Sequence, residues 1–373
     1  MESSFKFLVY SKLKRIILIC SLITVFILVE IINWTCLILD HLFFPSFKKT
    51  KVKPPLFIIG MPRSATTLCY SFLTADSQNF SSMKLWEILF APSVIQKKFL
   101  LLVKKIDALI NSPLYKSLKR FDRFFFRGIE DIHPISLFNY EEDDYLFTHV
   151  FTTLSVNFIF PDNKRILLLK QFDEKISERG KRFLMRYYLN CIKRHLFVFG
   201  GGKRYLAKSP THSSKIRTLL RYFPESRFIY MLRDPYYTIA STVCLFRRMK
   251  NFFCVEMEIE ALIPQIIMLA DTWYGYPLIS CKPLLGKSIF VLPFNELTKN
   301  SIRAVELIYF YLGLELSNDY KKFLKHADAL SKRHKTTNHY TPEEFGLNEQ
   351  VISKRYHFIY EDYFKNTAQQ ILI

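Results

Sequence analysis

The segment Pro55–Thr67, which reads PLFIIGMPRSATT, constrains the fold of this chain more than any other part of the sequence. Its apolar run Leu56–Ile59 predicts a buried strand, and Gly60 ends that run in a tight turn. Apolar residues then return at helical spacing from Leu68 onward. A helix N-terminus offers unpaired N–H groups and the positive end of the helix dipole. The order of strand, turn and helix therefore predicts a binding loop for a phosphate or sulfate.

This loop differs from the ATP-binding loop that reads GxxxxGK[ST]. In that loop the lysine reaches the outer phosphates and the following hydroxyl holds magnesium. No GK[ST] follows Gly60 here, and the turn carries Arg63 and several hydroxyls instead. A plain strand followed by a helix with a Ser or Thr cap would also explain so short a pattern, so the loop alone does not decide the function.

A second segment, Ser226–Ala240, reads SRFIYMLRDPYYTIA and predicts another strand that ends in a charged turn. Arg233 closes the strand, and Ser241 follows eight positions later. A guanidinium grips a phosphate with two parallel hydrogen bonds, and a hydroxyl adds a directional one. Two anion-binding motifs at the carboxyl ends of two apolar strands are hard to explain as structural turns alone.

Together, the two motifs resemble those of the sulfotransferases, which bind 3′-phosphoadenosine 5′-phosphosulfate (PAPS) and work without a metal. The resemblance implies that the 5′-phosphosulfate lies on the first loop, at Arg63, Ser64, Ala65, Thr66 and Thr67. It gives Arg63 a catalytic role as well, as the basic residue that grips the sulfate and the bridging oxygen. It also implies that Arg233 and Ser241 bind the 3′-phosphate. The family usually has glycine where this chain has Ala65, and a methyl group there would crowd the approach of the ligand to the backbone.

The resemblance continues in order along the chain from Pro54. Its landmarks are Leu85-Trp86-Glu87, Ile132-His133-Pro134, the acidic run Glu141–Asp144, Tyr205–His212, Phe223-Pro224, His339-Tyr340 and Glu344–Leu347. They are similar to those of a large, mainly bacterial branch of membrane-associated or small-molecule sulfotransferases. The implied fold is α/β, with a central parallel sheet between two layers of helices, as in the P-loop nucleotide hydrolases. These landmarks do not identify the acceptor.

Sulfuryl transfer between two oxygens requires positioning, charge stabilisation and a base that removes the acceptor's proton. We assign the base to Glu87, because related sulfotransferases place a glutamate shortly after the first helix. The two apolar residues before it would also partly desolvate it and raise its proton affinity. His133 and His212 are the alternative bases. The resemblance gives Lys208 the role of neutralising charge on the leaving phosphate or the sulfuryl oxygens, whereas the run Glu141–Asp144 receives no catalytic role.

Strands alternate with helical segments along the chain, which independently favours a parallel sheet flanked by helices. We expect strands near Leu56–Ile59, Arg204–Ala207, Arg227–Leu232 and Ser288–Leu292, and helical segments within 83–111 and 178–199. Residues 1–53 form the predicted membrane anchor with its basic flanks, and residues 54–373 form the predicted sulfotransferase domain.

The N-terminal region contains an apolar segment, Ile16–Leu39, in which Glu30 is the only charged residue. A run of this length is sufficient to cross the hydrocarbon core of a bilayer, which takes about 20 residues. A signal peptide fits less well, because no small-residue cleavage site follows. A helix lying in the interface is a third interpretation, since Glu30 would be costly at mid-membrane. Basic residues on both sides of the segment leave the orientation open.

The chain is strongly basic, with 53 Lys and Arg against 33 Asp and Glu and a net charge of +20. Such an excess attracts anionic lipid headgroups, PAPS or nucleic acid. Nucleic-acid binding is disfavoured, because no zinc spacing, RNA-binding aromatic signature or basic repeat accompanies the charge. The seven cysteines contain no CxxC pair, which argues against a metal site or a disulfide framework.

These features predict a membrane-anchored enzyme that moves a sulfuryl group from PAPS to a hydroxyl, with a lipid or other amphiphile as the hypothetical acceptor. The 36 phenylalanines could line an apolar pocket for such an acceptor. Two alternatives remain open at this point. One is a nucleotide-binding membrane protein that has lost transferase activity, which Ala65 makes conceivable. The other is an ATP-dependent phosphoryl transferase, which would need magnesium and would be indifferent to the 3′-phosphate.

Overall fold

A computed structural model describes residues 2–127, 135–160, 163–253, 255, 258–333 and 341–365 of the chain. Five parallel strands form its central sheet, in the order β2 (Phe80–Ser81), β3 (Arg204–Lys208), β1 (Lys53–Gly60), β4 (Arg227–Leu232) and β5 (Ile289–Pro293). The predicted strands are confirmed as β1, β3, β4 and β5. The edge strand β2 is an addition that the sequence pattern did not predict.

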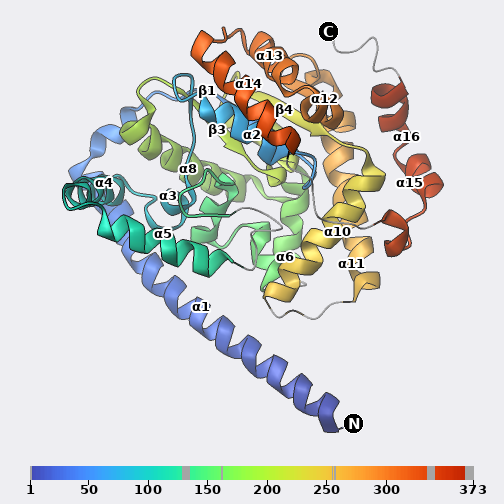
Figure 1. Ribbon diagram of the computed structural model, residues 1–373, viewed down its shortest axis with the longest axis horizontal. Coiled ribbons are helices and arrows are strands. Elements are labelled where there is room, and N and C mark those ends of the chain that lie inside the picture. Colours follow the sequence, from blue (N-terminus) through green and yellow to red (C-terminus); the bar gives the residue numbers. More distant parts are fainter. Residues whose placement is uncertain are drawn as a thin grey trace.

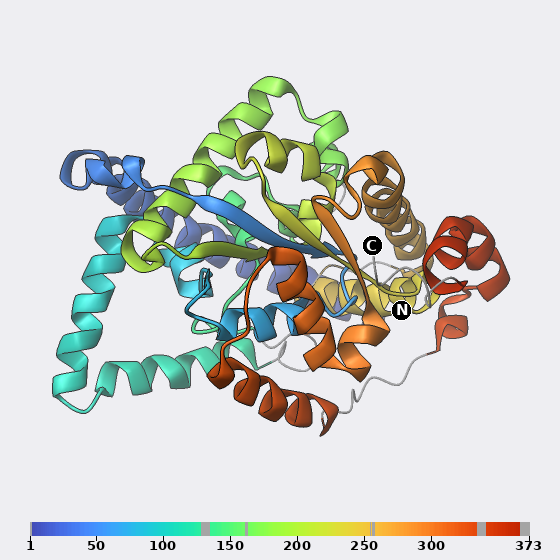
Figure 2. The same cartoon turned by 90° about the horizontal axis from the view of Figure 1, so that it is seen from above.

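Both faces of the sheet are buried, and this explains why its strands are apolar throughout. In β1, Phe57 and Ile59 belong to one core, whereas Leu56 and Ile58 belong to the other. The alternation follows from the pleat, which turns successive side chains to opposite faces. The predicted three-layer α/β architecture is therefore confirmed, and Figure 2 shows the sheet between its layers of helices.

Helices from distant parts of the chain cover the two faces. One core contains side chains of α8 (Glu178–His195), α9 (Ile216–Tyr222), α10 (Pro235–Phe252) and α11 (Ile259–Gly275). The other contains side chains of α2 (Thr66–Ala75), α13 (Ser301–Leu312) and α14 (Asn318–Arg333). The helical segment expected within 83–111 is split into α3 (Leu85–Phe90) and α4 (Val94–Leu109), because Ser93 begins a new helix by accepting the N–H of Gln96.

Further short helices and one long one surround these layers. Their bounds are α5 (Pro113–Phe126), α6 (Lys164–Leu167), α7 (Phe172–Lys175), α12 (Phe294–Lys299), α15 (Glu349–Arg355) and α16 (His357–Ile359). Helix α5 follows α4 and runs along the lower edge of the domain in Figure 1.

The N-terminal helix α1 (Glu2–Phe43) extends far beyond the domain, as Figure 1 shows. Its part Ile16–Phe43 is long and apolar enough to cross a membrane, a test that signal sequences also pass. The carboxyl-terminal end of α1 is built into the domain by polar contacts. Asp40 accepts the N–H groups of Val94 and Ile95 at the start of α4 and pairs with Arg194 of α8 at 2.7 Å. The predicted division of the chain after residue 53 stays a prediction.

Candidate functional site

The loop between β1 and α2 has a backbone shape that turns N–H groups toward a common space. Arg63 and Ala65 have φ values of 68° and 66°, in the left-handed region. Residues of this kind within a turn form concave nests of N–H groups that bind anions. Gly60, with φ 139°, lies so close to β4 that an added Cβ would stand 2.6 Å from the carbonyl oxygen of Met231. A glycine is therefore required where the loop leaves the sheet.

Neighbouring segments hold this loop in place. The Ser64 hydroxyl is buried and donates to the carbonyl of Met61 at 2.6 Å, which closes the turn on itself. The N–H of Gly60 donates to the hydroxyl of Ser213 at 3.0 Å, and Thr242 of α10 donates to the carbonyl of Pro62 at 3.3 Å. The loop is thus fixed from both sides, as a preorganised anion site requires.

The two motifs recognised in the sequence meet at this loop. Arg63 Nε donates to the hydroxyl of Ser241 at 3.1 Å, and Arg233 Nη1 donates to the carbonyl oxygen of Arg63 at 2.7 Å. The guanidinium of Arg233 also lies 4.5 Å from the ring centre of Phe294, within cation–π range. Two arginines and one hydroxyl are therefore gathered beyond the carboxyl ends of the adjacent strands β1 and β4.

A pocket of about 450 Å³ opens at these residues, within the usual size range of small-molecule sites. Its polar end is lined by Arg63, Ala65, Thr66, Thr67, Arg233 and Ser241. Its apolar wall includes Leu154, Phe158, Phe246, Met249, Leu269 and Trp273. Asn157 also lines the pocket, and its buried side-chain carbonyl oxygen has no hydrogen-bond partner among the described residues.

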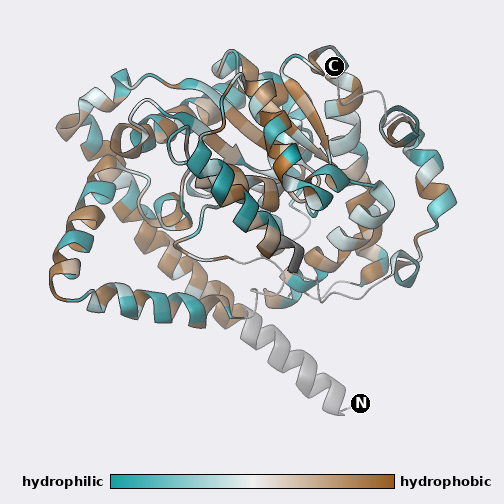
Figure 3. Cartoon of the chain, turned by 45° about the horizontal axis from the view of Figure 1, so that its top comes forward, coloured by the Kyte–Doolittle hydropathy of each residue, from teal (hydrophilic) through white to brown (hydrophobic). Residues whose placement is uncertain are grey.

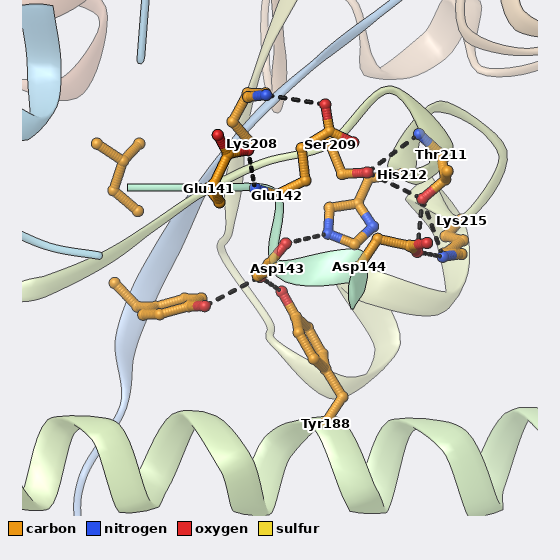
Figure 4. A network of polar contacts seen from close by, with 12 residues as sticks. Glu141, Glu142, Asp143, Asp144, Tyr188, Lys208, Ser209, Thr211, His212 and Lys215 are labelled. Atoms are coloured by element: carbon orange, nitrogen blue, oxygen red, sulfur yellow. Dashed lines mark hydrogen bonds and ion pairs between the residues drawn. The ribbon is translucent and has the colours of Figure 1, made fainter. Parts of the chain in front are cut away.

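Two aspartates of the acidic run are buried in a polar network beside the pocket, which Figure 4 shows. Asp143 accepts hydrogen bonds from the hydroxyls of Tyr188 and Tyr205 and pairs with His212 Nε2 at 2.9 Å. The second ring nitrogen of His212 is buried without a hydrogen-bond partner among the described residues. His212 is fully buried and absent from the described pocket lining, so its place fits a structural histidine better than a base.

Asp144 completes the network on the other side. It pairs with Lys215 and accepts hydrogen bonds from Thr211 at 2.6 Å and Thr153 at 2.8 Å. Burial opposes its ionisation, but the charges of Lys215 and His212, together with the hydrogen bonds from Lys215 and Thr211, outweigh burial and hold the pKa of Asp144 below its ordinary value. The two aspartates therefore tie the acidic run to α8, to β3 and to the segment that follows β3.

Glu142 is the member of the acidic run that faces the pocket. It lines the cavity, and its Oε1 accepts a hydrogen bond from Lys208 Nζ at 2.8 Å. The side chain of Lys208 is only 1 % exposed, against 19 % for Glu142. The sequence prediction passed over Glu142. A run of four acids in a basic chain drew attention to this segment, but nothing local to it distinguishes Glu142, whose partner Lys208 lies 66 positions away.

Glu87, the base predicted from the sequence, is buried away from the described pocket lining. It is 3 % exposed, and its carboxylate pairs with His195 Nδ1 at 2.8 Å and accepts the N–H of Lys84. Burial alone would raise the pKa of Glu87, but the charge and hydrogen bond of His195, with the charge of Lys97, lower it instead. The expected increase in proton affinity is therefore wrong. His133, the remaining alternative base, lies outside the described residues.

Comparison with known proteins places this geometry in a family. Residues 54–318 match the model of a sulfotransferase family. Over 207 residues the chain is 28 % identical to the omega-hydroxy-beta-dihydromenaquinone-9 sulfotransferases Stf3 of Mycobacterium bovis and Mycobacterium tuberculosis. That match covers 52 % of this chain and 45 % of each relative. The chain thus spans about half the length of the curated relatives it matches.

Solved structures of sulfotransferases share the fold. Sulfotransferase STF9 from Mycobacterium avium has a TM-score of 0.71 at 18 % identity, over 88 % of this chain and 81 % of that one. Sulfotransferase STF1 from Mycobacterium tuberculosis has a TM-score of 0.60 at 16 % identity, over the same shares of the two chains.

Proposed function

This chain belongs to the sulfotransferase family, and we propose that it transfers a sulfuryl group from PAPS to a hydroxyl group of a lipid or other amphiphilic acceptor. The observation that carries the proposal is the contact of Arg63 with both Ser241 and Arg233 at one end of the pocket. With this contact, Arg63 and Arg233 offer one cation to each of the two anionic groups of a single nucleotide.

The residues of the polar end fit such a donor. The N-terminus of α2, with Thr66 and Thr67, and the left-handed turn at Arg63 and Ala65 suit the 5′-phosphosulfate, because all of them present donors or positive charge. Arg233 and Ser241 suit the 3′-phosphate. PAPS supplies the activated sulfuryl group, and its 3′-phosphate distinguishes it from ATP.

We assign removal of the acceptor's proton to Glu142. This carboxylate lines the pocket, and Lys208 fixes its position from below the surface through a 2.8 Å hydrogen bond. A base must lie within hydrogen-bond reach of the proton it takes, and Glu142 meets that condition for an acceptor whose hydroxyl is held beside its carboxylate in the pocket. Glu87 stays the alternative from the sequence, and its lowered pKa and burial are weaker qualifications for the role. Lys208 is absent from the described pocket lining, so its role in neutralising charge at the reacting group stays a prediction, and the contact that supports a role for it is the one with Glu142.

A lipid acceptor is supported by the wall of the pocket and by its neighbourhood. The segment Leu154–Phe158 lines the cavity. Shortly before that segment, the ring of Phe151 packs edge-on against Phe26 of α1, with ring centres 5.3 Å apart. The apolar helix therefore contacts the chain three residues before the segment that lines the pocket. The matched relatives named for omega-hydroxy-beta-dihydromenaquinone-9 add a lipid-like quinone to the acceptor classes worth testing.

The experiment incubates the full chain with sulfur-labelled PAPS and either a total lipid extract or a total polar extract. Label should enter the lipid fraction and disappear when Arg233 is replaced by alanine. Label in the polar fraction alone would contradict the lipid acceptor. Phosphorylation of either fraction from labelled ATP and magnesium, without sulfation, would contradict the whole proposal. Binding of 3′-phosphoadenosine 5′-phosphate without any transfer would identify a nucleotide-binding protein that lacks activity.

A further inference from the structure

We propose that α4 and α5 form a second membrane contact, an arm that lies on the surface of an anionic bilayer beside α1. The α4–α5 arm is defined here as residues 94–126. The inference concerns attachment and does not depend on the proposed sulfotransferase reaction.

Helix α4 presents an apolar stripe to the outside. Phe99, Leu102, Ile106 and Leu109 are all exposed, and Leu109 is 85 % exposed. Their spacing of three to four residues places them on one face of the helix. A stripe of this kind normally packs on a protein core, but here it faces outward.

Helix α5 repeats the pattern and adds charge. Leu114, Leu118, Phe121 and Phe125 share one face and are exposed by about half of their surface. The opposite side of the helix carries the exposed basic residues Lys116, Lys119, Arg120 and Arg123. An aromatic and aliphatic face opposite a Lys and Arg face is the composition of helices that lie in a membrane interface.

The acidic residues of the arm are turned inward. The arm contains only Asp107 and Asp122 as acids, and both are buried. Asp107 accepts the N–H groups of Leu114 and Tyr115 and so clamps the start of α5 to the end of α4. Asp122 accepts the Ser136 hydroxyl and the N–H of residue 137 and so fixes α5 to the domain. The outer surface of the arm is therefore apolar and cationic, which complements anionic headgroups.

The arm is continuous with the apolar helix. The first N–H groups of α4 are capped by Asp40 of α1, and Gln96 donates to Asn33 of α1 at 2.7 Å. Ile38 and Leu42 lie on the outward face of this same part of α1 and are 67 % and 71 % exposed. Figure 3 shows the hydrophobic stretch of α1 and the mixed colouring of the arm. An anionic lipid surface fits both elements, whereas a protein partner would also have to match the row of lysines and arginines on α5.

The test places a fluorescent reporter on the arm of the full chain. Phe121→Trp, with Leu118→Trp as a second site, is reconstituted in vesicles whose phosphatidylcholine carries brominated acyl chains. The parent chain, which has three tryptophans, gives the baseline. The matched control is Phe310→Trp on α13, where the parent residue is 86 % exposed and far from α1 in Figure 1. We expect loss of most of the added emission at 121 and 118, and none at 310.

Charge is tested in the same background. Adding phosphatidylglycerol should increase the quenching of the tryptophan at position 121. The triple variant K116E/K119E/R123E should abolish this increase, because it should weaken binding of the arm to the anionic bilayer about tenfold or more. The control variant K321E/K322E/K325E on α14 should show the same increase in quenching as the parent charge pattern. Equal quenching at 121 and 310, or no response to phosphatidylglycerol, overturns the proposal. An unquenched F121W that sediments as a dimer in detergent also overturns it, because the face would then belong to a second copy.

Discussion

Arg63 and Ser241 are 178 positions apart in the sequence and share a hydrogen bond of 3.1 Å between Nε and the hydroxyl oxygen. The bond links the loop after β1 to helix α10, and Arg233 reinforces the link through the carbonyl oxygen of Arg63. The loop after β1 and the segment from Arg233 to Ser241 are therefore held together by hydrogen bonds. A substitution in either one should change the position of the other.

The first prediction concerns Ser241. S241A should weaken binding of 3′-phosphoadenosine 5′-phosphate by about 10- to 150-fold, because a hydrogen bond to a charged group contributes roughly 1.5–3 kcal/mol. Binding of adenosine 5′-phosphosulfate, which lacks the 3′-phosphate, should change much less. Calorimetry with both nucleotides measures the difference, and S71A on the outer face of α2 is the control. Equal losses for the two nucleotides would show that Ser241 acts only by holding Arg63.

The second prediction separates two carboxylates. E142Q should lower kcat by about 10²–10⁴-fold with little change in nucleotide affinity, since it removes the proposed base but leaves an amide oxygen that can still accept the hydrogen bond of Lys208. E87Q should mainly destabilise the fold, because it leaves His195 with a weaker partner in a buried site. Turnover and urea unfolding of both variants decide the matter. A folded E87Q with the larger loss of kcat would restore the assignment made from the sequence.

The third prediction concerns the backbone at Ala65. Its φ of 66° lies in the region that costs a side-chain-bearing residue about 1–2 kcal/mol. A65G should bind 3′-phosphoadenosine 5′-phosphate more tightly, because removing the methyl group lets the ligand approach the loop. A65V should lose both stability and affinity, because a β-branched side chain tolerates this conformation poorly. Unchanged affinity in A65G would mean that the methyl group does not restrict the site.

Much of the fold could be predicted from the sequence, for identifiable reasons. The strands β1 and β4 are continuous apolar runs that end in charged turns. The apolar runs predicted that both strands are buried, and the charged turns predicted where they end. The meeting of Arg63 with Arg233 followed from two motifs at the same edge of a parallel sheet. The two-residue strand β2 could not be predicted, because Phe80–Ser81 is too short to show a period.

The side-chain pairs in and around the site were much less predictable, because the two members of each pair are far apart in the sequence. Glu87 pairs with His195 across 108 positions, and Asp143 meets Tyr205 across 62. Neither pairing leaves a local pattern. Because the sequence does not reveal His195 as the partner of Glu87, only desolvation by the neighbouring apolar residues was considered. The pKa of Glu87 was therefore expected to rise, whereas it is lowered.

The fourth prediction concerns the fate of α1. Asp40 is fully buried, pairs with Arg194 and caps α4, so this end of the helix is part of the folded domain. D40N should lower the free energy of unfolding by about 3–5 kcal/mol, as expected for breaking a buried ion pair.

The intact helix should also be retained in the mature protein, which intact-mass measurement can check. A mature chain beginning after residue 43 would contradict this and support a signal sequence.

The fifth prediction concerns pH and Lys97. This lysine is buried and donates to the carbonyls of Ala91 and Pro92, and burial lowers its pKa from 10.5 to about 8, against an opposing charge from Glu87. Between those two pH values the unfolded chain holds more protons at this position than the folded chain. The free energy of unfolding should therefore rise with pH in that window, by at most about 1.4 kcal/mol per pH unit. K97M removes the titrating group, so the difference between parent and variant isolates it from the other titrating groups. Urea unfolding at a series of pH values measures both slopes. Parallel curves for the parent chain and K97M would show that Lys97 keeps its proton in the folded state.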